Sequence, residues 1–329
     1  FARRSGELIG VLRGGSEENR AFAREELGRM GRVVVPALAE AAKDEDDEVR
    51  CDVARALGAT RCEEALAPLR ALASDDGWSV REAAAEGMGR LHAKAAGDTL
   101  LAMLEDDAWR VRLAAIRALG EVGEARAVAS LVPLAEDVDE DVRYAAFVAL
   151  AKIGDPAGRE AMLGGLDAPD PNVRKACAEG LGRAGRPEDV EALARRVLDE
   201  SQDVRLAVVL SMTRLSGGGL PNSARLAVDN WVDALAIQDP SLEYPARQAL
   251  GQLGAAAIPW LIDRVTGSPE PAQVALLQLI LLHPDSLAIA PCAALIATPS
   301  PLVRLVVIDL LAAIRTSESD ALLLRLATE

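Results

Sequence analysis

A Val-Arg dipeptide recurs along the chain at constant spacing, and this feature limits the possible folds more than any other. It occurs six times at equal intervals, at Val49-Arg50, Val80-Arg81, Val111-Arg112, Val142-Arg143, Val173-Arg174 and Val204-Arg205. The interval of 31 residues is typical of architectures in which each repeat is one supersecondary unit. The pattern therefore predicts a stack of repeats rather than one domain around a single core.

The same frame continues on both sides of the six regular copies. It begins in degenerate form at Asn19-Arg20 and returns at Leu242, Ala272 and Val303-Arg304, which makes ten starts. The step from Val204 to Leu242 is longer than the regular steps. The frame predicts a single solenoid over residues 1–329, with regular repeats at 19–216.

The long step is attributed to an insertion at residues 217–223, which is rich in glycine. We expect this insertion to form a projecting loop between the two helices of the seventh repeat, with Ser223 as the N-cap of the second helix. Residues 224–329 are then divergent, charge-poor repeats.

Each repeat contains two apolar stripes at helical spacing. In one copy they are Val111, Ala114, Ala115, Ala118 and Leu119, followed by Val128, Leu131, Val132 and Ala135. Acidic clusters precede the first stripe. Carboxylates at this position can cap free backbone amides and interact favourably with the positive end of the helix dipole. A helical hairpin with two apolar faces cannot bury both alone, so neighbouring hairpins are predicted to stack.

The full pattern, D-x-x-V-R-x-x-A-A-x-x-A-L-G-x-x-G, resembles the HEAT-like repeats of the phycobilisome-lyase type. The resemblance covers nearly the whole chain and implies an all-α fold, a right-handed α-solenoid of about ten stacked hairpins with a 31-residue period. Proteins with such repeats include scaffolds, regulatory subunits, bilin lyase subunits and DNA glycosylases. The repeat therefore predicts the architecture and leaves the activity open.

The charge and cysteine content bear on partners and location. The net charge is −15, so the chain has no long-range attraction to phosphate backbones, and a nucleic-acid partner is not expected. Cys51, Cys62, Cys177 and Cys292 form no C-x-x-C pair, which predicts free thiols in a reducing compartment, the cytoplasm.

Because the chain opens with Phe1 instead of methionine, we interpret it as a fragment of a longer protein.

The arginine of each dipeptide is predicted to form a structural column, one side chain per repeat. This arginine column comprises Arg50, Arg81, Arg112, Arg143, Arg174 and Arg205. Each member is expected to join carboxylates of adjacent turns. The column is interrupted at Glu243 and Gln273, so the eighth and ninth repeats must be held together by other contacts.

Trp78 and Trp109 occupy the same repeat position, in the turns that lead into neighbouring first helices. Stacked helices lie ~8–10 Å apart, so the two indoles are expected to be close to each other. They serve either as anchors for a partner or as covers for the ends of their own hairpins. With His92 and His283 far apart and no clustered nucleophile or metal ligands, no catalysis, metal or cofactor is predicted.

The second helices are expected to line a long concave surface that binds a partner protein. The predicted contact residues on this face are Arg126, Ser130, Pro133, Ala157, Ala161, Gly164, Glu188, Ala192 and Arg195. Small residues dominate its middle, which predicts an open groove without strong charge.

The last third of the chain is poor in charge. Charged side chains are less than half as frequent from Gly217 to Glu329 as in the part of the chain before Gly217. The apolar runs there are too short to span a bilayer, so residues 274–311 are predicted either to be buried in their own stack or to dock another domain or a second copy.

The leading interpretation is a non-catalytic protein–protein interaction scaffold that binds its partner along the concave face. The resemblance implies two alternatives. One is a bilin lyase or lyase-like chaperone subunit, for which no chromophore site is evident. The other is a HEAT-like DNA glycosylase, which requires a basic concave face and a catalytic carboxylate among aromatic side chains.

Overall fold

The computed structural model describes residues 2–237 and 239–326. Within these residues the regular elements are α-helices and short 3-10 helices, without a strand. After α1 (Ala2–Gly14), the first helices of the repeats are α2 (Glu17–Arg29), α4 (Asp47–Ala59), α6 (Trp78–Leu91), α8 (Trp109–Val122), α10 (Glu140–Ile153), α12 (Pro171–Ala184), α14 (Gln202–Leu215), α16 (Pro240–Leu253), α18 (Glu270–Leu281) and α20 (Pro301–Ile314).

The second helices are shorter, and each but the last follows a turn of 3-10 helix. They are α3 (Val35–Ala41), α5 (Leu66–Leu72), α7 (Gly97–Ala102), α9 (Val128–Leu134), α11 (Arg159–Gly165), α13 (Val190–Ala194), α15 (Arg225–Ala234), α17 (Ile258–Val265), α19 (Ile289–Leu295) and α21 (Ser317–Leu326). First and second helices alternate through ten repeats, as the sequence predicts. The all-α solenoid is thereby confirmed.

In the regular part of the chain, the helices begin at intervals equal to the 31-residue period of the sequence repeat. The first helices α4 to α14 begin at 47, 78, 109, 140, 171 and 202, and the second helices α3 to α13 begin at 35, 66, 97, 128, 159 and 190. Acidic side chains cap many first helices, as expected: Asp46, Asp139 and Asp170 each accept a bond from a backbone amide two residues ahead. Local capping thus repeats with the same period as the packing.

The irregular step differs in detail from the predicted seven-residue insertion. The interval that separates α4 from α5 and α8 from α9 would place the start of α15 at Pro221, but α15 begins at Arg225. Four of the extra residues therefore belong to the loop, and the others lengthen α15, which has ten residues. Ser223 lies inside the 3-10 helix Asn222–Ala224 and does not cap α15, whose N-cap is Ala224. The predicted cap was wrong because this 3-10 turn precedes the helix.

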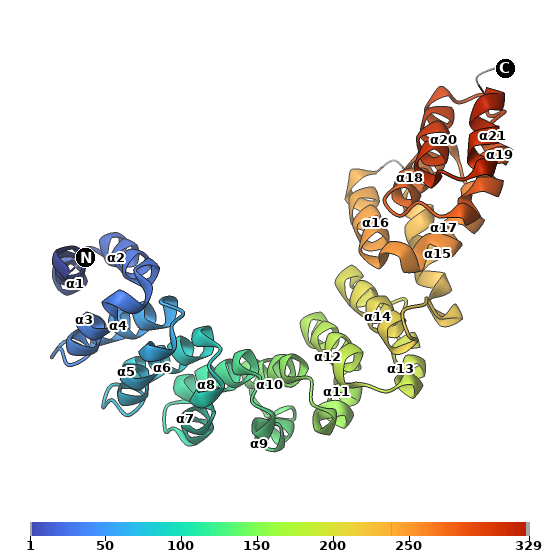
Figure 1. Cartoon of the computed structure of the whole chain (residues 1–329). Coiled ribbons are helices and arrows are strands. Elements are labelled where there is room, and N and C mark those ends of the chain that lie inside the picture. The colour runs from blue at the N-terminus through green and yellow to red at the C-terminus, as the bar shows by residue number, and fades with distance from the viewer. Residues whose placement is uncertain (1, 238, 327–329) are drawn as a thin grey trace. The chain divides into compact units, whose positions relative to one another are not determined.

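The chain divides into two compact units, Phe1–Gly185 and Arg186–Glu329, called unit 1 and unit 2. Unit 1 contains α1 to α12, and unit 2 contains α13 to α21 (Figure 1). The cysteines at 51, 62, 177 and 292 are free thiols. No helix among the described residues is long and apolar enough to cross a bilayer.

In unit 1 the first helices form a close-packed layer. A Cβ atom added at Gly58 on α4 would lie 2.6 Å from the Cα of Gly87 on α6, and one added at Gly120 would lie 2.8 Å from the Cα of Ala149. Neighbouring first helices pack along their length, whereas neighbouring second helices barely touch. Small residues therefore set the spacing of the first-helix layer.

This difference in spacing decides which layer faces inward in unit 1. In a curved stack the closely spaced layer lies on the inside of the curve, so the first helices form the inner layer and the second helices the outer layer (Figure 1). The expectation that second helices line the concave surface was therefore wrong for unit 1. The sequence pattern shows two helices per repeat but does not contain the distances between repeats.

In unit 2 the apolar segment 274–311 is mostly buried within its own stack. Leu276, Ile280, Val307 and Leu310 are completely inaccessible to solvent. Several large apolar side chains nevertheless remain exposed, namely Leu282, Leu287, Leu302, Leu305 and Ile308. Internal burial thus accounts for most of the segment, and docking through the exposed residues remains a prediction.

Candidate partner-binding surfaces

The arginine column ties each first helix to the turn before it. The Nη1 of Arg50 donates to the carbonyl oxygens of Asp44 and Glu45 at 2.8 and 3.0 Å. The same bonds, to residues six and five positions earlier, recur at Arg81, Arg112, Arg143, Arg174 and Arg205. These bonds satisfy carbonyl groups of the acidic turn and were not anticipated from the sequence. The constant spacing between turn and arginine was the available signal.

The predicted bonds to carboxylates of the next repeat are present at two positions. Arg50 forms a two-pronged contact with Asp75 at 2.8 and 2.9 Å, and Arg81 forms the same contact with Asp106 at 2.7 and 2.9 Å. The Arg81 guanidinium holds the pKa of Asp106 at about 2. Among the described residues, Arg112 and Arg143 bond only carbonyl oxygens. All six column arginines hold the turn before their own helix, and Arg50 and Arg81 also link neighbouring repeats.

The repeats without a column arginine are held together by other pairs, as expected. In unit 2, Arg247 on α16 donates to the side-chain oxygen of Gln278 on α18 at 2.9 Å. Arg264 on α17 binds Asp229 on α15 at 2.6 Å and also Asp233. These contacts replace the column at Glu243 and Gln273.

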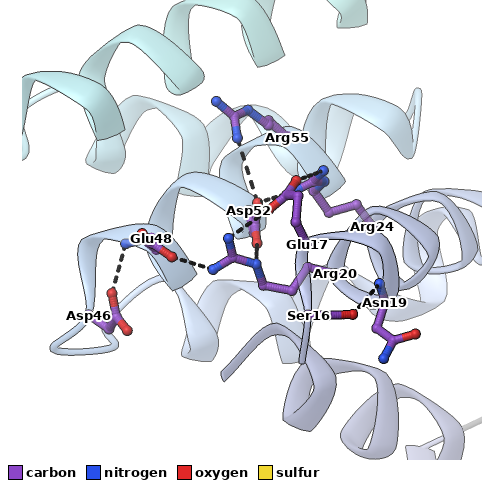
Figure 2. Close-up of polar contacts among 9 residues, drawn as sticks. All are labelled: Ser16, Glu17, Asn19, Arg20, Arg24, Asp46, Glu48, Asp52 and Arg55. Carbon is purple, nitrogen blue, oxygen red and sulfur yellow. Dashed lines mark hydrogen bonds and ion pairs between the residues drawn. The ribbon is translucent and has the colours of Figure 1, made fainter. Parts of the chain in front are cut away.

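A buried aspartate joins the first two repeats (Figure 2). Asp52 on α4 is 2% exposed and forms an ion pair with Arg24 on α2, while the Nε of Arg20 lies 3.6 Å from its Oδ2. Glu17 bonds both of these arginines, at 2.6 and 2.9 Å, and they lower its pKa to about 2. The charges of the network are compensated within it, so it is a structural joint between α2 and α4 rather than a reactive site.

Two tryptophans share one arginine on the surface of unit 1. Trp78 and Trp109 are 45% and 52% exposed, and the Arg110 guanidinium carbon lies 5.3 Å from each indole centroid. Both rings are within cation–π distance of the same cation, so the expected proximity of the indoles is present. Each tryptophan is the first residue of its helix, α6 or α8, rather than part of the preceding turn.

Next to this cluster, the inner layer contains a groove between α6 and α8. Its volume is about 410 Å³, and its walls include Glu82, Glu86, Arg90, Arg110 and Arg117. Burial, followed by the negative charge of Glu86, raises the pKa of Glu82. Among the described residues, the exposed Arg90 and Arg117 form no ion pair. The groove therefore presents free guanidinium groups beside carboxylates and exposed indoles.

The contact residues predicted on the second helices are accessible, and those in unit 1 lie on its outer side. Ala161 and Ala192 are half-buried, and Arg126, Ser130, Pro133, Ala157, Gly164, Glu188 and Arg195 are exposed. The last helix of this set, α13, belongs to unit 2. Arg126 is not free, because it pairs with Asp98 at 2.7 Å and with Glu124 at 2.9 Å. Of this set, Ala161 and Gly164 line a cleft between α9 and α11.

Neither a metal site nor a histidine site is evident in the described part of the chain. No group of three or more His, Cys, Asp or Glu side chains there is placed to hold a metal ion. His92 ends α6 in the left-handed conformation, and its Nδ1 lies 2.8 Å from the carbonyl oxygen of Glu121.

Comparison with solved structures finds several chains of similar fold at low sequence identity. YibA of Escherichia coli superposes with a TM-score of 0.51 and 18% sequence identity, over 80% of this chain and 96% of that one. An engineered protein gives a TM-score of 0.49 with 19% identity, covering 95% of this chain and 99% of its own. The CpcE–CpcF complex of phycocyanin lyase from Nostoc sp. PCC7120 gives a TM-score of 0.46 with 24% sequence identity. The superposition covers 76% of this chain and 94% of that chain.

Sequence comparison identifies the repeat directly. No curated protein sequence matches the chain. The family model for HEAT repeats matches three overlapping segments, residues 7–89, 72–151 and 129–213. These segments cover more than half of the chain and coincide with its regular repeats, and the protein therefore belongs to the HEAT-repeat family.

Proposed function

We propose that the protein is a non-catalytic protein–protein interaction scaffold whose principal contact surface is the inner layer of unit 1. The observation that carries the proposal is the exposed cluster of Trp78, Arg110 and Trp109. Tryptophan and arginine are the residue types most enriched among interface side chains that dominate binding energy. Two indoles that remain about half exposed leave much of their apolar area available for a partner.

The neighbouring groove supports the same function. Its wall carries Arg90 and Arg117 next to Glu82 and Glu86, an arrangement that suits a polar rim around an aromatic centre. Mixed charge of this kind contributes to selectivity and association rate more than to affinity. The proposal requires neither a cofactor nor a bound metal.

A second candidate, a DNA glycosylase of the HEAT-like kind, is favoured by one observation. The inner groove combines three arginines with Glu82, whose pKa is raised, and Arg110 also contacts two indoles. The net charge of −15 opposes binding to a phosphate backbone and favours the scaffold. An electrophoretic shift with duplex DNA at low salt separates the two, because the scaffold is expected to leave DNA unshifted.

Site-specific photo-crosslinking tests the scaffold proposal. A photoreactive residue is placed at Arg90 or Arg117 on the inner layer and, as a matched control, at the exposed Ala67 on α5 in the outer layer. In an extract of the source cell, we expect a discrete protein adduct from the two inner positions and none from the control. The adduct should decrease at least about tenfold when Trp78 and Trp109 are replaced by alanine.

Three outcomes would contradict the proposal. They are an adduct that does not depend on the tryptophans, an adduct formed only from the outer control position, and transfer of a bilin to an acceptor protein by the isolated chain. Thermal unfolding of the Trp78→Ala/Trp109→Ala variant provides the folding control, and little change is expected because both indoles are exposed.

A further inference from the structure

The outer layer of unit 1 contains a cleft that the partner surface proposed above does not use. It lies between α9 and α11 and has a volume of about 590 Å³. The apolar part of its lining includes Val132, Phe147, Ala161, Gly165 and Val173. A cleft of this size accommodates one or two large side chains of a ligand or partner.

The floor of the cleft includes a glycine where the preceding repeats hold a large side chain. The positions equivalent to Gly165 in the three preceding repeats hold Leu72, Met103 and Leu134. A Cβ atom at Gly165 would lie 2.6 Å from Cε1 of Phe147 and 2.4 Å from Sγ of Cys177. The ring of Phe147 therefore occupies part of the vacated space, and the floor of the cleft is packed and fixed in shape.

One position earlier on the same helix, the space is open. A Cβ atom at Gly164 would have no heavy atom within 4 Å beyond its own helix. Gly164 lines the cleft and is exposed. The opening toward solvent is thus bordered by a residue that leaves room for an incoming side chain.

The rim of the cleft is strongly acidic. The lining residues include five carboxylates and one arginine: Glu136, Glu140, Glu160, Asp167, Asp170 and Arg143. Glu160 is paired with Arg159, whereas Glu136 and Glu140 form no ion pair within the described chain. The Nη1 of Arg143 is held by the carbonyl oxygens of Asp137 and Val138 at 2.7 and 2.9 Å. The rim therefore has an excess of negative charge.

We propose that this cleft binds a short segment of a partner protein that inserts a leucine-like side chain and carries lysine or arginine on either side of it. The apolar floor takes the inserted side chain, whose removal from water supplies the affinity. Glu136 and Glu140 attract the flanking cations and give the selectivity. An acidic segment would meet the carboxylates of Glu136 and Glu140, which form no ion pair within the described chain, so it is expected to be excluded. This site lies on the opposite layer from the surface of the proposed function and is independent of it.

Fluorescence anisotropy with two labelled peptides tests the assignment on the full chain. One peptide has a central pair of leucines flanked by lysines, and the other has glutamates in place of the lysines. We expect saturable binding of the lysine peptide, weakened by added salt, and no binding of the glutamate peptide. Gly164→Phe should fill the cleft and abolish binding, and Glu136→Lys with Glu140→Lys should weaken it at least about tenfold.

Matched controls separate these effects from folding. Ser130→Phe places the same ring on an exposed position of α9 outside the cleft, and Glu105→Lys reverses an exposed charge elsewhere in unit 1. Both controls should bind the lysine peptide as the wild type does. Gly164→Phe should melt no lower than the wild type, because it removes a glycine from a helix.

The inference is overturned if neither peptide binds, if the glutamate peptide binds as well as the lysine peptide, or if Gly164→Phe leaves binding intact. Trp78→Ala/Trp109→Ala distinguishes this result from the proposed function, because this variant should retain peptide binding while losing the crosslinked partner. Loss of peptide binding in that variant would also overturn an independent cleft.

Discussion

At the residue scale, unit 1 is held together by arginines that satisfy groups which would otherwise be buried without partners. Arg20 and Arg24 compensate the charge of Asp52, and the column arginines bond the carbonyl oxygens of each acidic turn. Removing one partner of a buried ion pair leaves an uncompensated charge, which costs more than the pair contributed. The two kinds of arginine contact therefore predict different responses to substitution.

The first prediction concerns the buried aspartate. Asp52→Ala leaves Arg20 and Arg24, which are mostly buried, without their central carboxylate and should destabilise the N-terminal repeats by about 3–5 kcal/mol. The control Glu48→Ala removes an exposed partner of the same Arg20 and should cost less than about 1 kcal/mol. Urea unfolding followed by circular dichroism measures both. Equal losses of unfolding free energy in the two variants would show that Asp52 does not hold α2 and α4 together.

The second prediction is a dependence on pH. The folded protein holds the pKa of Asp106 at about 2, below its usual 3.8, so the unfolded chain binds this proton first as pH falls. The ion pair with Arg81 therefore stabilises the protein above about pH 4, and the contribution is lost between about pH 4 and 2. It is on the order of 1–2 kcal/mol.

Comparison with Asp106→Asn measures this contribution. The difference in unfolding free energy between wild type and Asp106→Asn should be largest above about pH 4 and shrink toward about pH 2. Asp76→Asn, at an exposed position in the preceding turn, should show no such trend. A difference that is constant with pH would contradict the assignment.

At the element scale, the contact between first helices depends on residues without side chains. Gly58→Ala would place a Cβ atom 2.6 Å from Gly87 on the neighbouring helix, and overpacking of this kind costs about 1–3 kcal/mol. Gly10→Ala is the matched control, because this helical glycine on α1 has no neighbour within 4 Å. It should stabilise the protein by about 0.5–1 kcal/mol. Thermal unfolding distinguishes the signs, and a stabilising Gly58→Ala would refute close packing of this layer.

The loop between α14 and α15 gives a second prediction for an element. Deleting Gly217–Leu220 leaves Ser216 and Pro221, a connection as long as the one between α12 and the following 3-10 helix. Gly217 and Gly218 have φ of 74° and 96° and no neighbour within 4 Å of an added Cβ atom. The deletion should retain the helical circular dichroism signal and the melting temperature within a few degrees. Loss of the signal would show that the loop is part of the stack.

At the scale of the whole molecule, the exposed leucines of unit 2 decide whether the chain associates. Leu302 and Leu305 on α20 are 60% and 57% exposed, whereas Leu310 on the same helix is fully buried. If residues 274–311 dock a second copy, Leu302→Asp with Leu305→Asp should lower the mass measured by light scattering and leave the melting temperature nearly unchanged. Leu310→Asp should instead unfold unit 2, because it buries a charge without a partner. A wild-type chain that is already monomeric would rule out self-association through α20.

The amino-acid sequence was sufficient to predict the repeat, the helices within it and many of their caps, because these depend on contacts between residues close in the chain. The starts at 47, 78, 109 and 140 follow from one period and from turn residues that recur with it. The common position of Trp78 and Trp109 was also evident, as was the arginine that recurs in each of the regular repeats. These features required no knowledge of distances between repeats.

The tertiary structure was needed to show which layer of unit 1 faces inward and which surfaces are open to solvent. The spacing of the first helices depends on Gly58 meeting Gly87 across a repeat boundary, and small differences of this kind accumulate into the curvature of the stack. The position of Arg110 between two indoles and the cleft beside Gly165 arise in the same way. Each depends on which side chains a neighbouring repeat places nearby. The periodicity of the sequence contains no information about the distances between side chains of different repeats.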